Sequence, residues 1–318
     1  MIQNKKKKIL ILGASGFIGR NCVEFFLKTN YEIIGVYFKN KPTFSKKIKL
    51  FKHDLKKEKG LNKIFKNIDI LIQAAATTSG AKDIVSKPFI HVNNNAIINS
   101  VVTSAAYAAK VPRIINFSCT VMYKSSKKPL NEYQFYPNKI LSNYFGAAWM
   151  KIYVEKLCEF YSKFGVNKFT LIRHSNIYGP YDKFDLKKSH VFGATVAKIM
   201  NQKNKFIEVW GNGSEQRNFL HVDDLMNFID LAIKKQKKNY GLYNLGNNKS
   251  ISIKELVNKI KTISGSKIPI IFNLRKPTLK ININIDSTRA KKEFGWKQKI
   301  SLEKGIKKTI NWYKKNYL

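Results

Sequence analysis

The chain has 318 residues, of which 44% are hydrophobic, and a formal net charge of +39. Its length allows a large buried core. It contains no run of 18 apolar residues, and the basic segment from Lys5 to Lys8 is followed by only four apolar residues before a glycine, which favours neither a membrane span nor a signal peptide. The three cysteines are odd in number and lack metal-site spacing, so we predict no disulfide framework and no metal site. We expect a soluble, cytoplasmic protein.

The positive charge is spread along the chain rather than gathered in one segment. Lysine outnumbers arginine 53 to 6, and lysines occur from Lys5 to Lys315. A nucleic-acid-binding protein concentrates its charge on one face and favours arginine for bidentate contacts. We therefore expect no specific nucleic-acid partner, although such a field would steer a nucleoside diphosphate toward its site.

Apolar strands alternate with amphipathic helices in the first half of the chain. Strands are expected at residues 9–12, 33–38, 48–51, 70–74, 113–118 and 169–173, and helices near 17–28, 61–66, 92–109 and 148–164. This alternation predicts an α/β fold with a doubly wound parallel sheet of the Rossmann type. After residue 180 the pattern is irregular, until helices near 253–264 and 302–315. We interpret residues 1–175 as a dinucleotide-binding domain, to which the chain returns near 218–247, and residues 176–318 as a smaller substrate-binding lobe.

The first strand runs directly into three glycines spaced three residues apart. Gly13 would let the chain turn, Gly16 would let backbone N–H groups approach a pyrophosphate, and Gly19 would let the next helix pack close to the sheet. An ordinary glycine-rich turn is the alternative, but the position after the first strand favours a dinucleotide site. The turn residues expected to contact the cofactor are Gly13, Ser15, Gly16, Phe17, Ile18 and Gly19.

The spacing G-x-x-G-x-x-G resembles that of the extended short-chain dehydrogenase/reductase family, and the resemblance covers nearly the whole chain. Other similar motifs are His53-Asp54-Leu55, Gln73-Ala74-Ala75-Ala76, Asn176-Ile177-Tyr178-Gly179-Pro180, Ser189-His190-Val191, Val209-Trp210-Gly211, Arg217-Asn218-Phe219-Leu220-His221-Val222-Asp223-Asp224 and Phe294-Gly295-Trp296. Together they are similar to the nucleotide-sugar members of the family. The resemblance implies a homodimeric, NAD(P)-dependent epimerase or reductase that acts on a GDP-linked or other nucleoside diphosphate 4-keto hexose.

The resemblance also implies which residues hold the cofactor beyond the glycine turn. It places Asp54 near the adenine, for which the alternative is a loop residue that caps the following helix. The remaining residues assigned to the cofactor in this way are Leu55, Ala74, Ala75, Ala76 and Lys151.

The end of the second strand bears on the type of cofactor. NAD-specific sites usually carry an Asp or Glu there, which accepts a hydrogen bond from the ribose 2′-OH. Here the strand ends in Lys39-Asn40-Lys41, without a carboxylate, and a cation suits a 2′-phosphate. We therefore favour NADP(H), with NAD(H) as the alternative if Lys39 and Lys41 are merely solvated.

Five residues of the second half are candidates for the substrate site. The resemblance places Asn176 near the sugar or first phosphate, and Arg217 and Lys198 on the diphosphate. Trp210 is expected against the nucleotide base, and a core position is its alternative. His190 stands where the resemblance implies an epimerisation acid, and imidazole titrates near working pH.

The catalytic motif departs from the family pattern. The family pairs a tyrosine general acid/base with a lysine four residues later, while a Ser or Thr hydroxyl binds the reacting oxygen. Alignment puts the lysine on Lys151, so that Ala147 occupies the tyrosine position. The nearest tyrosines, Tyr144 and Tyr153, lie seven residues before and two after Lys151, and neither spacing matches the family arrangement on one helix face.

The Ser/Thr position falls on Cys119, with Ser118 and Thr120 beside it. Cys119 is a candidate thiol acid/base, or else a small buried residue at a strand end. The expected catalytic residues are therefore Lys151, Cys119, Thr120 and His190. If none of them replaces the tyrosine, the chain is a catalytically weakened nucleotide-sugar-binding protein of the same fold. A nucleoside diphosphate sugar dehydratase or 4-epimerase is a further alternative.

Overall fold

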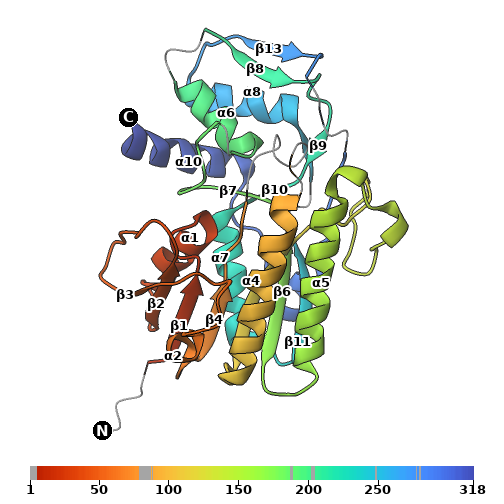
Figure 1. Ribbon diagram of the computed structural model, residues 1–318. Coiled ribbons are helices and arrows are strands. Elements are labelled where there is room, and N and C mark those ends of the chain that lie inside the picture. Colours follow the sequence, from red (N-terminus) through yellow and green to blue (C-terminus); the bar gives the residue numbers. More distant parts are fainter. Residues whose placement is uncertain are drawn as a thin grey trace.

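The computed structural model describes residues 6–78, 87, 89–186, 189–201, 205–247, 249–276, 278 and 281–318. Seven parallel strands form the main sheet in the order β11-β6-β5-β4-β1-β2-β3 (Figure 1). This order confirms the predicted doubly wound α/β fold. The strands are β1 (Lys8–Leu12), β2 (Glu32–Tyr37), β3 (Lys49–Lys52), β4 (Ile70–Gln73), β5 (Arg113–Cys119), β6 (Lys168–His174) and β11 (Tyr240–Leu245).

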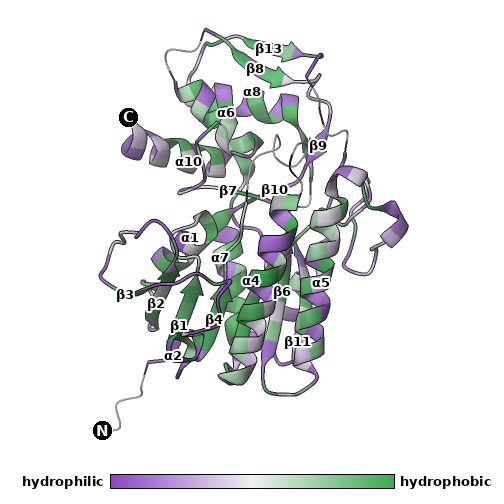
Figure 2. Cartoon of the chain, viewed as in Figure 1, coloured by the Kyte–Doolittle hydropathy of each residue, from purple (hydrophilic) through white to green (hydrophobic). Residues whose placement is uncertain are grey.

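Helices cover both faces of the sheet, and Figure 2 shows hydrophobic strands between them. Side chains alternate along a strand, so Ile9 and Ile11 pack into one apolar cluster while Leu10 and Leu12 pack into the other. The first cluster includes residues of α1 (Phe17–Phe26), α7 (Val222–Lys235) and α9 (Thr288–Phe294), and the second includes residues of α2 (Leu61–Phe65), α4 (Phe89–Ala108) and α5 (Phe145–Ser162).

A smaller C-terminal region has an apolar cluster of its own. Ile306, Ile310 and Tyr313 belong to it and form the buried stripe of the predicted last helix. Its main elements are α6 (Val191–Met200), β8 (Ile207–Trp210), α8 (Ile253–Ser264), β13 (Ile270–Asn273) and α10 (Leu302–Tyr317). Short pairs connect the two regions: β7 (Asn176–Tyr178) with β10 (Phe219–His221), and β9 (Gln216–Arg217) with β12 (Ile251–Ser252). Two 3₁₀ turns, η1 (Pro137–Lys139) and η2 (Ser142–Tyr144), precede α5.

The stretch after residue 180 is more regular than the sequence pattern predicts. The helix α6 was not expected, because it is apolar on most of its surface and lacks a clear 3.6-residue pattern. The strand β11 contains Gly241 and Asn244, which weaken its strand signal. It forms because each of its residues pairs with β6, from Tyr240 opposite Phe169 to Leu245 opposite His174.

Among the described residues, no helix is long and apolar enough to cross a membrane. Cys22, Cys119 and Cys158 are free thiols. The described part of the chain holds no group of three or more His, Cys, Asp and Glu side chains suited to a metal ion.

Candidate active site

The glycine turn joins β1 to α1 at the carboxyl edge of the sheet. Gly13 has a φ of +72°, and a Cβ at this position would lie 2.7 Å from the Cα of Ala75. A Cβ on Gly19 would overlap the carbonyl oxygen of Gly13. Gly16 is different, because its φ is −82° and a Cβ there would meet only that oxygen, at 3.3 Å. The fold itself therefore requires Gly13 and Gly19, whereas Gly16 leaves space open in front of α1.

This open space fits the pyrophosphate of a dinucleotide. The first-turn N–H groups of α1, on Phe17, Ile18 and Gly19, have no carbonyl partner within the helix. Gly16 is the N-cap, no side chain caps the helix, and its first turn has no acidic residue. Since β1 lies between β2 and β4, the turn is also at the switch point of the sheet, where ligands of such folds bind. Ser15 is exposed beside it.

The residues expected beside the adenosine lie at the ends of β2 and β3. Lys39 and Lys41 are exposed, and the Lys39 Nζ lies 6.0 Å from the centre of the Phe38 ring. The Asp54 Oδ1 accepts a hydrogen bond from the Lys56 N–H at 3.1 Å, so this carboxylate closes a local turn. Leu55 is buried in the core below.

The segment after β4 runs beside the glycine turn. The Ala74 N–H donates to the Leu12 carbonyl at 3.1 Å, which continues the β1–β4 pairing. Gln73 is buried, and its side chain exchanges two hydrogen bonds with the Ala75 backbone, each 3.2 Å long. Ala76 follows and is exposed. The backbone of residues 74–76 is thus fixed within contact distance of Gly13.

The candidate catalytic residues meet at the carboxyl ends of β5 and β6. Cys119 pairs in register with His174, and Lys151 reaches the same strand end, where its Nζ donates to the Phe117 carbonyl at 2.7 Å. Burial raises the pKa of the Cys119 thiol, which Lys151 partly opposes. Thr120 follows and is only 9% exposed. Because its pKa is raised, Cys119 is a protonated thiol at neutral pH and a poor base.

Ala147 lies one helical turn before Lys151 on α5, on the same face of the helix. A methyl group therefore stands where the family places its phenol. Nearby hydroxyl groups are engaged elsewhere: Ser118 is fully buried and donates to the Glu155 carboxylate at 2.6 Å. The Tyr153 hydroxyl shares a 2.9 Å hydrogen bond with Ser100 on the outer surface.

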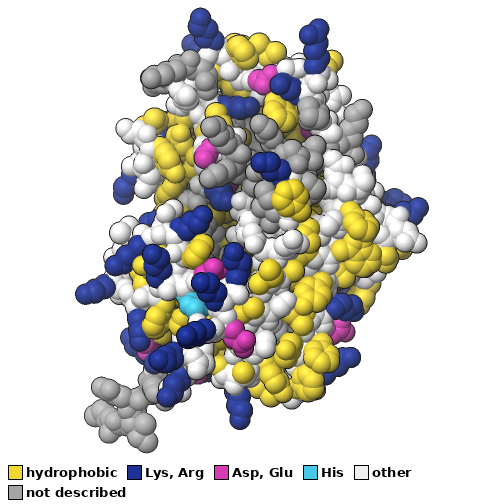
Figure 3. Space-filling view, viewed as in Figure 1, with side chains coloured by type: hydrophobic (Ala, Val, Ile, Leu, Met, Phe, Trp, Pro, Cys, Tyr) yellow, Lys and Arg dark blue, Asp and Glu magenta, His cyan; other side chains and the backbone are white. Residues whose placement is uncertain are grey.

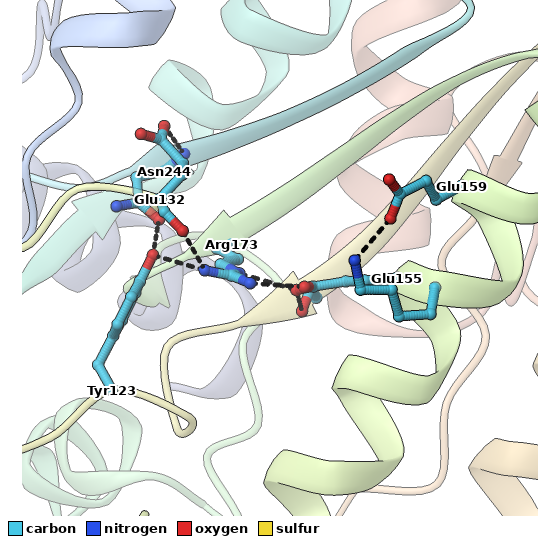
Figure 4. A network of polar contacts seen from close by, with 8 residues as sticks. Tyr123, Glu132, Glu155, Glu159, Arg173 and Asn244 are labelled. Atoms are coloured by element: carbon cyan, nitrogen blue, oxygen red, sulfur yellow. Dashed lines mark hydrogen bonds and ion pairs between the residues drawn. The ribbon is translucent and has the colours of Figure 1, made fainter. Parts of the chain in front are cut away.

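A buried polar network lies beneath this strand end (Figure 4). Arg173 binds the Glu155 carboxylate through two nitrogens, at 2.8 and 2.6 Å. Its Nη1 also donates to the Tyr123 hydroxyl at 2.9 Å, and this hydroxyl donates to the Asn244 side chain at 2.8 Å. Tyr123 is therefore held by two partners and is not available as a proton donor to a substrate.

Two histidines border the same space. Burial lowers the pKa of His174 to about 4, and its Nδ1 shares a 2.7 Å hydrogen bond with the Ser175 carbonyl. His190 is the N-cap residue of α6, without a capping hydrogen bond from its side chain, and it is exposed to solvent. Partial burial of its ring lowers its pKa below the ordinary value, and the charges of Lys183 and His91 lower it further. The charges of Lys151 and His190 lower the pKa of His174 further. Both rings are neutral at pH 7.

The expected substrate residues divide into two groups. Asn176 donates to the Asn218 carbonyl at 2.9 Å, and Arg217 donates to the Gln216 carbonyl at 3.1 Å, both between the sheet and the C-terminal region. Burial lowers the pKa of Arg217, and the nearby Tyr144 phenol raises it. Tyr144 was excluded by its spacing alone, yet it lies beside a predicted site residue.

Lys198 and Trp210 form the second group, around Glu208. The Lys198 Nζ donates to the Glu208 carbonyl at 2.8 Å, and the Trp210 indole N–H donates to its carboxylate at 3.2 Å. Burial lowers the pKa of Lys198, while Glu208 raises it. Trp210 is 38% exposed, so the alternative of a core position is wrong.

A surface hollow of about 820 Å³ lies elsewhere. It is lined by α2 and the C-terminal end of α4, which leads into the start of β5. That is the amino edge of the sheet, opposite the glycine turn. Since it contains none of the residues above, we assign it no part in the site.

The comparison with known proteins agrees with this geometry. The NAD dependent epimerase/dehydratase family matches residues 9–246. The chain is 29% identical over 313 residues to GDP-L-colitose synthase of Yersinia pseudotuberculosis, covering 96% of this chain and 97% of that protein. It is 28% identical over 261 residues to GDP-L-fucose synthase of Escherichia coli K12, covering 78% and 81%.

Solved structures of low sequence identity share the fold. UDP-glucose 4-epimerase of Thermotoga maritima, solved with UDP-glucose, has a TM-score of 0.87 at 23% identity, covering 98% of this chain and all of that one. UDP-glucose 4-epimerase of Bifidobacterium longum, solved with NAD+ and UDP, has a TM-score of 0.82 at 24% identity, covering 98% and 99%. The family match spans the glycine turn, the ends of β5 and β6 and β11, and the chain belongs to the NAD dependent epimerase/dehydratase family.

Proposed function

We propose that this chain is an NAD(P)-dependent nucleotide-sugar epimerase/reductase of the GDP-L-fucose synthase type, acting on a GDP-linked or other nucleoside diphosphate 4-keto hexose. The observation that carries the proposal is the position of Lys151, Cys119 and His174 around one strand end, at the same edge of the sheet as a glycine turn whose helix N-terminus no side chain caps. The similarity to enzymes named for GDP-L-colitose and GDP-L-fucose supports the choice of substrate class.

When bound, a reduced nicotinamide would supply hydride to the carbonyl carbon of the sugar. The residues of the turn (Gly13, Ser15, Gly16, Phe17, Ile18 and Gly19) would hold its pyrophosphate, and Lys151 its ribose. Neutral His190 would remove and return a proton on the carbon beside the carbonyl, which is the step that epimerisation requires. Asn176, Arg217, Lys198 and Trp210 would hold the nucleoside diphosphate.

NADP(H) is the proposed cofactor. The exposed ammonium groups of Lys39 and Lys41 follow β2, and the strand end offers no carboxylate that would repel a 2′-phosphate. A family-wide use of both cofactors leaves NAD(H) as the second choice.

We also propose a homodimer that forms through the outer faces of α4 and α5. In Figure 3, hydrophobic side chains gather over these helices. Phe145 is 59% exposed and Phe160 53% exposed on α5, and Ile97 is exposed on α4. Exposed apolar area of this kind on two adjacent helices is typical of an interface. Sedimentation of the parent and of Phe160→Glu tests it: a parent that sediments as a monomer at micromolar concentration contradicts the dimer.

The second candidate is a catalytically weakened nucleotide-sugar-binding protein, and Ala147 is the observation that favours it. One experiment separates the two. The protein is mixed with NADPH and GDP-4-keto-6-deoxymannose, and cofactor oxidation is followed together with calorimetric binding of NADPH and GDP. Turnover supports the enzyme; binding without turnover supports the binding protein; and the loss of both contradicts the nucleotide-sugar assignment.

A further inference from the structure

The proton donor of the family is missing from α5. Lys151 still reaches the end of β5, but the residue one turn earlier is Ala147. A carbonyl reduced at this strand end must receive a proton on its oxygen, and a methyl group cannot supply one. Catalysis therefore needs an acid from another position in the fold.

Most of the candidate acids near Lys151 are already engaged. Ser118 and Tyr123 donate their hydroxyl protons to other buried side chains. His174 is neutral and bonded to a backbone carbonyl. Tyr153 pairs with Ser100 on the outer surface of α5.

Tyr144 differs from these groups. It is the N-cap residue of α5, three positions before Ala147, and its N–H donates to the Leu141 carbonyl at 2.9 Å. Its ring is partly buried and packs against the apolar cluster of Tyr123, Leu130, Ile281, Ile283 and Ile285. Within the described ranges, no group hydrogen-bonds its hydroxyl. The phenol is thus held by its ring and backbone, with its O–H left available.

Two site residues lie close enough to act on this phenol through their charges. Burial raises the pKa of Tyr144, the Arg217 guanidinium lowers it, and Cys119 raises it. The Lys151 ammonium in turn lowers the pKa of Cys119. The geometry is consistent with these charge effects: Tyr144 lies seven residues, or two helical turns, before Lys151. The Arg217 guanidinium donates to the carbonyl of Ile281, a residue of the apolar cluster that holds the Tyr144 ring, so Arg217 is placed to stabilise a phenolate.

We propose that Tyr144 is the general acid/base of this chain, in the role of the tyrosine that Ala147 replaces. This proposal rests on the function proposed above. In the reductive direction, the Tyr144 O–H bond breaks and its proton passes to the carbonyl oxygen of the keto sugar. The carbonyl carbon meanwhile accepts a hydride from the reduced nicotinamide cofactor, so that C=O becomes CH–OH. The phenolate that remains beside Arg217 then takes a proton from water.

The test compares four proteins: the parent, Tyr144→Phe, Tyr153→Phe as the matched control on the same helix, and Tyr144→Phe combined with Ala147→Tyr. Turnover is measured with NADPH and GDP-4-keto-6-deoxymannose from about pH 6 to about pH 11, and binding of NADPH and of GDP is measured separately. We expect Tyr144→Phe to lower kcat by ~10²–10⁴-fold, the usual contribution of a positioned proton donor, with both affinities unchanged. Tyr153→Phe should keep the parent rate, and the combined variant should recover part of it.

The pH profile distinguishes proton transfer from a structural role. Because burial raises the pKa of Tyr144 above its ordinary value of 10, the parent should keep its activity up to pH 10 and lose it only above that pH, as the phenol ionises. The residual activity of Tyr144→Phe should lack that loss. A Tyr144→Phe variant that turns over at the parent rate overturns the proposal and leaves the proposed function standing. A parent that binds NADPH and GDP without any turnover also overturns it, whereas a parent that binds neither removes the proposed function itself.

Discussion

Arg173 on β6 and Glu155 on α5 form a buried bidentate ion pair, with nitrogen–oxygen distances of 2.8 and 2.6 Å. Their side chains are only 5% and 4% exposed. Glu155 is one helical turn after Lys151, so the pair fixes the rotation of α5 against the sheet. The position of Lys151 at the end of β5 depends on this contact.

Loss of one partner should therefore be costly. We expect Glu155→Gln to lower the free energy of unfolding by ~3–5 kcal/mol, because it leaves the Arg173 charge buried and unpaired. Urea unfolding measures this difference. The matched control is Glu159→Gln on the same helix, whose pair with Lys156 at 2.8 Å is exposed and should contribute less than about 1 kcal/mol. Equal effects of the two substitutions would contradict a structural role for the buried pair.

Gly16→Val should abolish dinucleotide binding while the protein stays folded. The φ of −82° suits any residue, and a Cβ at Gly16 would lie 3.3 Å from the Gly13 carbonyl oxygen, a tight contact that a small shift relieves, but the side chain would fill the place of the pyrophosphate. Calorimetry measures the affinity of the variant for NADPH, and thermal unfolding shows whether the variant is folded. In contrast, Gly19→Ala should lower both affinity and Tm, because its Cβ overlaps the Gly13 carbonyl. Unchanged NADPH affinity in Gly16→Val would defeat the assignment.

NADPH should bind more tightly than NADH, and the difference should shrink as salt is raised. Lys39 and Lys41 are exposed, so salt screens their attraction for a 2′-phosphate. Replacing both lysines with glutamine should reduce the preference, whereas Lys314→Gln on α10 should not change it. The dissociation constants of both cofactors at low and high salt give the answer. A parent that prefers NADH would refute the prediction.

His190→Asn should suppress proton exchange at the carbons beside the sugar carbonyl, since an amide cannot take up and return a proton there. Deuterium wash-in from solvent reports this exchange independently of hydride transfer. Because burial lowers the pKa of His190 below its ordinary value, the neutral ring that removes the proton should persist to lower pH than in a free histidine, and exchange in the parent should do the same. Exchange at the parent rate in the variant would remove His190 from the mechanism.

Asp182→Asn should stabilise the protein at alkaline pH. Burial raises the pKa of this carboxyl from 3.8 to about 7, so the folded protein holds its proton over a range in which the unfolded chain has lost it. Stability from this group is therefore lost as the pH rises from about 4 to about 7. At pH 8 the substitution should restore up to about 4 kcal/mol, at 1.36 kcal/mol per pKa unit, and at pH 4 it should restore little. Thermal unfolding of both proteins across this range checks the sign, and a gain that is independent of pH would contradict it.

The sequence by itself determined six of the seven strands of the main sheet and the glycine turn. Local patterns carry both: Ile9–Leu12 is a short apolar run, and Gly13, Gly16 and Gly19 have a spacing that few other structures require. Because connections between parallel strands are almost always right-handed, the order of strand, turn and helix along the chain then leaves one common topology for the sheet. The replacement of the family tyrosine by Ala147 was equally visible, because the i, i+4 spacing on a helix is a local property.

Only the tertiary structure decided which residues complete the site. The strand β11 forms through its pairing with β6, although its own sequence favours a strand weakly. Tyr144 and Arg217 are 73 residues apart, and no periodicity links them. Both lie beside Ile281: its carbonyl accepts a hydrogen bond from the Arg217 guanidinium, and it belongs to the apolar cluster against which the Tyr144 ring packs. The four-residue spacing of the family motif excluded Tyr144, because that spacing applies to residues within one helix, whereas Tyr144 is the N-cap residue before α5. The apolar cluster beneath its ring holds the phenol in place.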